Sequence, residues 1–256
     1  MNIALIGNGA IAGYVQAALP QEVKTRLVRS KKLLGETIPQ QIDRVADLPR
    51  DTELVVDCAG HEALRAHGPD ILAAGFDLIT LSIGALADDE FADALRAAGK
   101  AGDARLHLAS GAIGALDCLR AAQIGTLTEV RYVGRKPPQG WLGSPAQDSI
   151  DLGVLTKGAL VHFNGTARDA AQRYPKNANV AAAVALAGLG FDATTVELIA
   201  DAGISANIHE IHATGDFGNF TFRIEGDTLP DNPRTSALAA MSAVAAIRMR
   251  QHALHF

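Results

Sequence analysis

The sequence is poor in cysteine, in excess positive charge and in long apolar runs. Its two cysteines, Cys58 and Cys118, exclude a disulfide framework and a cysteine-based metal cluster, so we expect no bound metal. The net charge of −5 gives no electrostatic reason to expect nucleic acid or an anionic membrane as a partner. The most apolar stretch, residues 180–190, is too short to cross a bilayer, and no signal-like segment precedes the first apolar run. A cytoplasmic protein is the default expectation.

The composition is that of a globular chain. Hydrophobic residues make up 48% and charged residues 20% of the 256 residues. This length predicts one large domain or two small ones, each able to bury a core.

The first 110 residues alternate between short apolar runs and helical patterns. The expected strands are Asn2–Ile6, Thr25–Val28, Glu53–Cys58, Asp77–Leu81 and Arg105–Ala109. The expected helices are Ala10–Leu19, Glu62–Ala66, Asp70–Ala74 and Asp88–Ala98. Continuous apolar strands between helices are typical of a parallel sheet covered on both faces. The pattern predicts a Rossmann-type, doubly wound α/β domain over residues 1–110.

The alternation ends after Ser110, and residues 111–256 are expected to form a second, α+β domain with a mostly antiparallel sheet. Its expected helices are Ala115–Ile124, Thr166–Gln172 and Val180–Leu189, and its expected strands are Glu129–Val133, Thr194–Ala200, Asn207–Thr214 and Asn219–Glu225. A final helix, Thr235–Gln251, has Thr235 or Ser236 as its N-cap. This helix is also a candidate for packing back on the first domain.

A glycine motif, Gly7-Asn8-Gly9-Ala10-Ile11-Ala12, follows the first apolar run. Gly7 permits a tight turn, Gly9 lets the backbone approach a pyrophosphate, and Ala12 is small enough for the next helix to pack on the strand. The start of that helix, at Ala10 and Ile11, offers unpaired N–H groups and a positive dipole end to phosphates. The motif predicts a dinucleotide site; an ordinary glycine turn is the alternative.

The end of the second expected strand bears on the choice between NAD and NADP. An NAD site usually has an acid about 20 residues beyond the glycines, which binds the ribose hydroxyls. Residues 27–32 contain no acid, whereas Arg29, Lys31 and Lys32 carry positive charge and Ser30 a hydroxyl. These groups suit a 2′-phosphate, so NADP is expected to bind at least comparably to NAD. The alternative is a solvated basic turn.

Small residues recur at the carboxyl ends of three other expected strands, in segments 58–61, 82–85 and 110–114. Ligands of open parallel sheets bind at this edge, so Ala59 and Ser82 are candidate contacts of a nicotinamide. Ordinary strand-to-helix turns would explain the same glycines.

Several motifs, in order along nearly the whole chain, resemble the L-aspartate dehydrogenase family. Besides the glycine motif they are Ser110-Gly111-Ala112-Ile113-Gly114, Arg135-Lys136-Pro137-Pro138, residues 174–182 (Tyr-Pro-Lys-Asn-Ala-Asn-Val-Ala-Ala), Asn207-Ile208-His209-Glu210-Ile211 and Asn232-Pro233-Arg234-Thr235-Ser236. The resemblance implies that Ala112 and Asn179 contact the cofactor, that His209 is catalytic, and that the chain forms a homodimer. The sequence departs from the commoner family pattern at Ala12, where glycine is frequent, and at residues 58–60, where a run containing glutamate is common.

His209 also fits a catalytic role on physical grounds. A histidine titrates near neutrality and can exchange protons with water. On the expected strand 207–214, His209 and His212 point to opposite faces and are poor candidates for a shared metal site. A lone histidine on a strand is more often a packed or surface residue, and the resemblance is what favours His209.

A dicarboxylate substrate needs cationic or N–H partners. One candidate is Lys136, which follows an expected strand. Asn164 and Thr166 lie at an expected helix start, where anions bind readily. Arg234 and Thr235 lie at the start of the last expected helix. Helix capping explains Thr166 and Thr235 equally well.

The resemblance implies an NAD(P)-dependent enzyme that deaminates L-aspartate oxidatively to oxaloacetate and ammonia through iminoaspartate, and catalyses the reverse amination, with a possible place in pyridine nucleotide biosynthesis. His209 would be the general base toward the attacking water. The alternatives are a dihydrodipicolinate reductase-like imine reductase and a non-catalytic NAD(P)-sensing protein.

Overall fold

The computed structural model describes residues 1–29, 39–175, 177–230 and 232–253. The chain divides into two compact units. The first comprises Met1–Gly111 and the C-terminal segment from Ala239, and the second comprises Ala112–Leu238. No helix of the described residues is both long and apolar enough to span a membrane.

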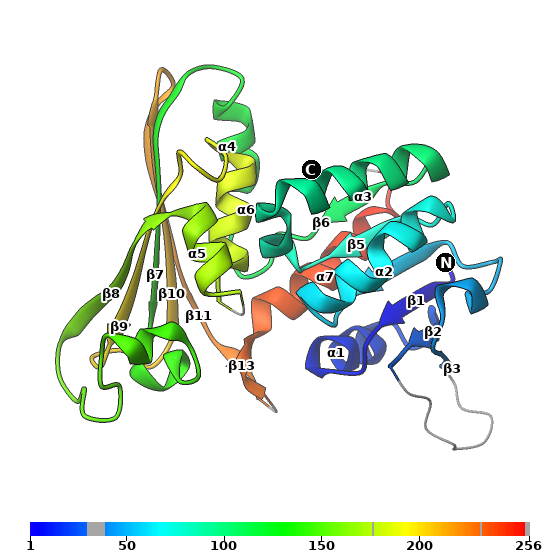
Figure 1. Ribbon diagram of the computed structural model, residues 1–256, viewed down its shortest axis with the longest axis horizontal. Helices are drawn as coiled ribbons and strands as arrows, with labels where there is room; N and C mark the ends of the chain where they lie inside the picture. Colours follow the sequence, from blue (N-terminus) through cyan, green and yellow to red (C-terminus); the bar gives the residue numbers. More distant parts are fainter. Residues whose placement is uncertain (30–38, 176, 231, 254–256) are drawn as a thin grey trace. The chain divides into compact units, whose positions relative to one another are not determined.

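The first unit is built on a six-stranded sheet in the order β3-β2-β1-β4-β5-β6 (Figure 1). Its strands are β1 (Ile3–Ile6), β2 (Val23–Leu27), β3 (Gln40–Ile42), β4 (Leu54–Asp57), β5 (Leu78–Thr80) and β6 (Leu106–Leu108). Every neighbouring pair is parallel. All residues of β1, β4 and β5 are buried, because helices cover both faces. The Rossmann-type prediction is confirmed.

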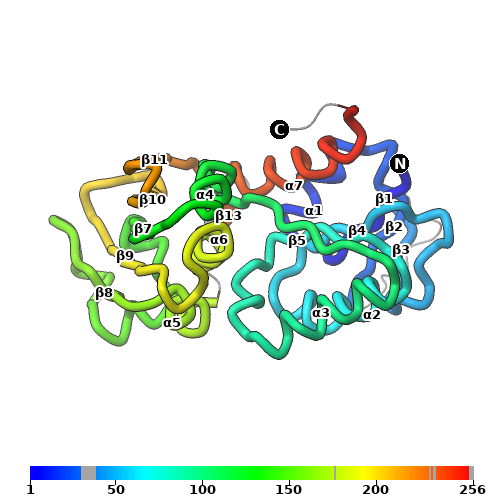
Figure 2. The backbone as a smooth tube through the Cα atoms, turned by 90° about the horizontal axis from the view of Figure 1, so that it is seen from above, coloured from blue at the N-terminus to red at the C-terminus, as the bar shows by residue number. Residues whose placement is uncertain are grey.

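Helices α1 (Ala10–Ala18) and α7 (Ala237–Met249) lie on one side of this sheet, and α2 (His61–Ala73) and α3 (Asp89–Gly102) on the other (Figure 2). Ala243, Val244 and Ile247 of α7 share a core with side chains of β1, β4 and α1. The last helix therefore completes the first unit. It begins at Ala237 rather than at Thr235, because Thr235 and Ser236 extend β13 (Asn232–Ser236), which pairs with β12 (Thr228–Leu229).

Helix α2 is continuous where the sequence predicted two helical segments. Pro69 lies inside it and removes one helical hydrogen bond. The helix persists because Leu64, Ile71 and Leu72 are buried along one side. Gly68 lies on the same side, and a side chain there would press within 3.1 Å of Leu95 of α3.

The second unit contains a five-stranded sheet in the order β11-β10-β7-β9-β8. Its strands are β7 (Leu127–Lys136), β8 (Ala159–Thr166), β9 (Thr195–Asp201), β10 (Asn207–Gly215) and β11 (Gly218–Gly226). Only the β7–β9 pair is parallel, so the predicted mostly antiparallel sheet is confirmed. Helices α4 (Leu116–Ala122), α5 (Ala167–Arg173) and α6 (Asn179–Ala187) lie on one side of it (Figure 1).

Candidate active site

The glycine turn has the two features that a dinucleotide phosphate site needs. Gly7 has a φ of +93°, and a Cβ there would lie 2.7 Å from the Cβ of Ala59. Gly9 is the N-cap of α1, and a Cβ there would meet nothing within 4 Å. Gly7 is thus required for the turn itself, whereas Gly9 leaves open space at a positive helix end. This space, beside the first turn formed by Ala10 and Ile11, fits a pyrophosphate.

A cavity of about 620 Å³ opens beside this turn. It is lined by Ile6, Gly7, Asn8, Gly9, Leu27, Val28, Arg29, Cys58, Ala59, Glu62, Ala63, Ala66 and His67. The structure therefore brings together four of the predicted cofactor residues, Gly7, Gly9, Arg29 and Ala59.

Arg29 shares this cavity with a carboxylate that local spacing does not reveal. Its Nη2 lies 3.0 Å from Oε2 of Glu62, in the first turn of α2, and both side chains are largely exposed. The end of β2 does lack an acid, but the helix that follows β4 supplies one to the same cavity. Ser30, predicted to assist Arg29, lies outside the described residues, as do Lys31 and Lys32.

A buried carboxylate, Asp57 at the end of β4, organises the loops at this edge of the sheet. It accepts hydrogen bonds from the hydroxyls of Thr80, at 2.8 Å, and Ser82, at 2.5 Å, and from the backbone N–H of Ala59, at 2.9 Å. Burial raises the pKa of Asp57 despite these bonds. The Ser82 hydroxyl, expected at the nicotinamide, thus donates its hydrogen to Asp57, and Ser82 is buried.

Arg26 of β2 supports the glycine turn. The side chain is buried and donates to Oδ1 of Asn8 and, at 3.5 Å, to the carbonyl of Ala12. Burial lowers the pKa of this guanidinium. A positive charge is therefore held directly behind the predicted phosphate site.

In the second unit, His209 of β10 is buried against β7. Its Nδ1 lies 2.7 Å from the hydroxyl of Tyr132, and only 5% of the residue is exposed. Burial, aided by the charge of Lys136, lowers the pKa of His209 to about 3. The imidazole is therefore neutral near pH 7, and the general-base role expected from the sequence stays a prediction.

His212 has different surroundings. Its Nδ1 lies 3.1 Å from the hydroxyl of Thr221 on β11, and its side chain is half-buried. His209 instead contacts Tyr132 of β7, the strand on the other side of β10, and is more deeply buried than His212. Among the described residues, no group of three or more histidine, cysteine, aspartate or glutamate side chains could hold a metal ion.

Lys136, the last residue of β7, places an ammonium group in the same region as His209. Its Nζ donates to Oδ1 of Asn177 at 2.8 Å and lies 5.0 Å from the ring centroid of Trp141. Burial lowers the pKa of Lys136 to about 8. This lysine is a cation that can be neutralised within an ordinary range of working pH.

An aromatic cluster, which we define as Trp141, His162 and Tyr174, packs beside Lys136. The ring centroids of Trp141 and His162 are 4.3 Å apart, and His162 Nδ1 lies 3.1 Å from the Tyr174 hydroxyl. Burial and the charge of Lys136 lower the pKa of His162 to about 4. Local spacing offers no periodic signal for this cluster, because its members come from a short 3-10 helix, an edge strand and a helix end.

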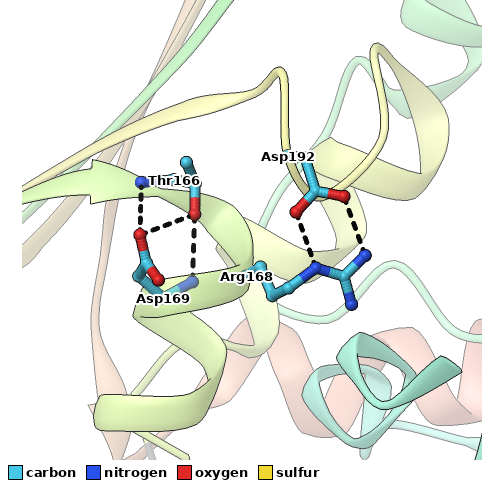
Figure 3. Close-up of polar contacts among 4 residues, drawn as sticks. All are labelled: Thr166, Arg168, Asp169 and Asp192. Atoms are coloured by element: carbon cyan, nitrogen blue, oxygen red, sulfur yellow. Dashed lines mark hydrogen bonds and ion pairs between the residues drawn. The ribbon is translucent and has the colours of Figure 1, made fainter.

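Of the other predicted substrate residues, the structure describes the side chains of Thr166, Asn164 and Thr235, and none of these three forms a hydrogen bond with Lys136. Thr166 is the N-cap of α5 and forms a capping box with Asp169, beside the Arg168–Asp192 ion pair (Figure 3). Its hydroxyl is therefore engaged in capping. Asn164 is exposed on the edge strand β8 rather than at a helix start, and Thr235 lies in β13. The side chain of Arg234 lies outside the described residues.

The two cofactor contacts implied by resemblance take distinct positions. Ala112 is buried and follows Gly111, whose φ is +72°. Asn179 is the first residue of α6 and is half-buried.

Comparison with protein-family models first identifies the class of protein to which the chain belongs. A family model described as the NAD-binding domain of homoserine dehydrogenase matches residues 7–109, so the first unit belongs to a nicotinamide dinucleotide-binding oxidoreductase. A second model, described as the aspartate dehydrogenase C-terminal domain, matches residues 117–250.

Relatives along the whole chain narrow the class. An L-aspartate dehydrogenase from Ruegeria pomeroyi is 55% identical over 99% of this chain and 94% of its own length. Another, from Pseudomonas aeruginosa, is 42% identical over 99% of both chains. The crystal structure of aspartate dehydrogenase from Thermotoga maritima superposes with a TM-score of 0.79 at 27% identity, covering 100% of this chain and 99% of that one. The chain belongs to the L-aspartate dehydrogenase family, and the resemblance inferred from its sequence is confirmed.

A dihydrodipicolinate reductase from Paenisporosarcina sp. TG-14 shares only the fold with this chain. Its structure gives a TM-score of 0.52 at 13% identity, covering 97% of this chain and 92% of that one.

Proposed function

We propose that this protein catalyses the NAD(P)-dependent oxidative deamination of L-aspartate to oxaloacetate and ammonia through iminoaspartate, and the reverse reductive amination. The observation that carries the proposal is that Lys136 lies close enough to the buried His209 for its charge to act on the imidazole, in a chain whose other unit holds a cavity beside a dinucleotide-type glycine turn. The family relationship and the similarity to proteins named L-aspartate dehydrogenase support it.

The cofactor's phosphates would bind at Gly9 and the first turn of α1, where Arg26 adds positive charge. Ala112 and Asn179 are its further contacts by resemblance. When bound, the nicotinamide accepts or delivers the hydride. The chain's own residues orient the substrate and exclude water around it.

Lys136 would bind a substrate carboxylate as a cation. Its ammonium group is already oriented by Asn177, and partial burial strengthens an ion pair with an incoming anion. His209 would contact the substrate at the reacting carbon, on the imidazole side that does not face Tyr132.

For the cofactor, we propose that both NAD(H) and NADP(H) bind. Arg29 suits the 2′-phosphate of NADP, whereas Glu62 suits the ribose 2′-hydroxyl of NAD. We further propose a homodimer in the cytoplasm whose product serves pyridine nucleotide biosynthesis, as the family resemblance implies.

The decisive experiment follows NAD(P)H absorbance with aspartate, or with oxaloacetate plus ammonia, using each nucleotide. Turnover in both directions is expected. Turnover with dihydrodipicolinate alone, or nucleotide binding without any turnover, would overturn the proposal.

Glu62→Gln tests the cofactor assignment. It should lower the KM for NADPH and leave that for NADH unchanged or higher, because it removes negative charge beside the 2′-phosphate. Asp93→Asn, which breaks the exposed Arg96–Asp93 pair on α3, is the matched control and should change neither. If Glu62→Gln changed the KM for both nucleotides equally, or changed neither, Glu62 would not lie beside the ribose 2′ position of the cofactor.

A further inference from the structure

Tyr132 is held where its hydroxyl can control His209. The two residues lie on neighbouring antiparallel strands, with His209 opposite Gly134 and Ile211 opposite Tyr132. The rings are nearly parallel, with an interplanar angle of 18° and centroids 6.0 Å apart. The Tyr132 hydroxyl lies 2.7 Å from Nδ1, and 1% of this tyrosine is exposed.

Gly134 makes this approach possible. A Cβ at position 134 would lie 2.7 Å from the Tyr132 hydroxyl oxygen. Any side chain there would have to displace the phenol from the space between the two strands. The glycine and the tyrosine therefore act together on the position of the hydroxyl.

The direction of this hydrogen bond follows from what each group can do. Burial raises the pKa of Tyr132, so the phenol keeps its proton. In the part of the chain that the structure describes, this hydroxyl has no other hydrogen-bond acceptor. A buried O–H without an acceptor is costly, so the phenol donates to Nδ1.

We propose that Tyr132 is a positioning residue, which fixes His209 in the tautomer that carries its hydrogen on Nε2. A neutral imidazole whose Nδ1 accepts from the phenol has its hydrogen on the other ring nitrogen. His209 therefore presents an N–H donor to the substrate in place of a basic lone pair.

This inference rests on the proposed function and changes the role of His209 within it. The Nε2–H group would donate to the oxygen on the reacting carbon: the ketone oxygen of oxaloacetate, or the hydroxyl that water adds to iminoaspartate. Such a bond stabilises charge that develops on this oxygen without moving a proton from His209. As water adds to iminoaspartate, the C–O bond forms while the C=N π bond breaks, and the proton of the attacking water goes to the imine nitrogen, which later leaves as ammonia.

The test is nitrogen NMR of the histidine side chains in the full-length protein, combined with steady-state kinetics. The wild type should show the His209 hydrogen on Nε2. Tyr132→Phe keeps the ring and removes only the donor, so the His209 signals should shift toward a mixture of tautomers. We expect kcat to fall about tenfold or more, with little change in the KM for NAD(P)H.

The matched control is Thr221→Val, which removes the hydroxyl beside Nδ1 of His212 on the same strand. It should leave the His209 signals and kcat unchanged. Gly134→Ala is a second probe, which displaces the phenol without removing it, and should reproduce the Tyr132→Phe tautomer shift.

A hydrogen on Nδ1 of His209 in the wild type would overturn the inference, and so would unchanged His209 signals in folded Tyr132→Phe. The NMR result does not depend on turnover. Absence of aspartate oxidation in the wild type would therefore refute the proposed function separately.

Discussion

Burial sets the charge states of the two side chains that dominate the second unit's site. Desolvation lowers the pKa of Lys136 to about 8 and that of His209 to about 3, the latter with help from Lys136. Near pH 7, the lysine is mostly a cation and the histidine is neutral. The pair can therefore hold an anionic substrate while offering it a neutral hydrogen-bonding group.

The ionisation of Lys136 predicts how activity depends on pH. If Lys136 binds a substrate carboxylate, kcat/KM for aspartate should fall as the pH rises through about 8, because the ammonium loses its proton. Lys136→Met should lower kcat/KM and abolish this limb of the profile. A rise in kcat/KM through the same pH range would instead identify the neutral amine as a base. Steady-state rates from pH 6 to 10 distinguish the two.

His209 gives a second prediction at this scale. His209→Ala should lower kcat by about a hundredfold or more, as the loss of a hydrogen-bond donor to charge that develops in the transition state usually does. Cofactor affinity, measured by NAD(P)H fluorescence titration, should change little. His212→Ala is the control and should retain activity. Loss of turnover in His212→Ala with full activity in His209→Ala would refute the assignment.

At the scale of elements, the first unit places its ligand-binding backbone at the carboxyl ends of parallel strands. The turn after β1 leaves open space at Gly9, and Asp57 at the end of β4 binds the loops that follow β4 and β5. The buried contacts of Asp57 with Ala59, Thr80 and Ser82 therefore help to fix the shape of these loops.

Substitutions of the two glycines of the turn should therefore have different effects, one on cofactor affinity and the other on stability. Gly9→Val should reduce NAD(P)H affinity strongly without lowering the thermal midpoint, since its Cβ enters open space. Gly7→Ala should destabilise the protein, because its φ is +93° and its Cβ would collide with Ala59. Calorimetry and fluorescence titration separate the effects. Normal cofactor affinity in folded Gly9→Val would place the dinucleotide elsewhere.

For the molecule as a whole, buried neutral histidines predict sensitivity to acid. His209 and His162 have pKa values of about 3 and 4 in the folded protein, against 6.5 for an ordinary histidine. Below about pH 6.5 the unfolded chain therefore binds protons that the folded chain does not. The stability that neutral burial contributes is complete above pH 6.5 and is lost as the pH falls toward 4 and 3.

Denaturant unfolding at pH 7 and pH 5 checks this expectation. The midpoint should be lower at pH 5, and His162→Gln should reduce the difference between the two midpoints because one titrating group is removed. His252→Gln, at an exposed position, is the control and should keep the wild-type difference. Equal midpoints at both pH values in the wild type would contradict the burial argument.

Local patterns predicted most elements because buried helices and strands have apolar residues in regular runs or spacings along the sequence. The runs that form β1 and β4 are apolar throughout, and His209 and His212 lie on a strand that was recognised. The missed strands have no such trace: β3 begins Gln40-Gln41, and β8 is an edge strand whose first three residues are exposed. The sequence predicted two helical segments, Glu62–Ala66 and Asp70–Ala74, but they form the continuous helix α2, in which Leu64 and Ile71 are buried.

The sequence by itself determined the Rossmann-type unit and the family, because these depend on neighbours along the chain or on motifs. For the same reason it could predict the phosphate-binding turn and the roles of His209 and Lys136. Only the tertiary structure decided what surrounds these residues. Glu62 reaches Arg29, and Tyr132 reaches His209, across 33 and 77 positions of sequence. The depth of burial that keeps His209 neutral also comes from packed strands. Contact and desolvation depend on distance in space, which local spacing does not encode.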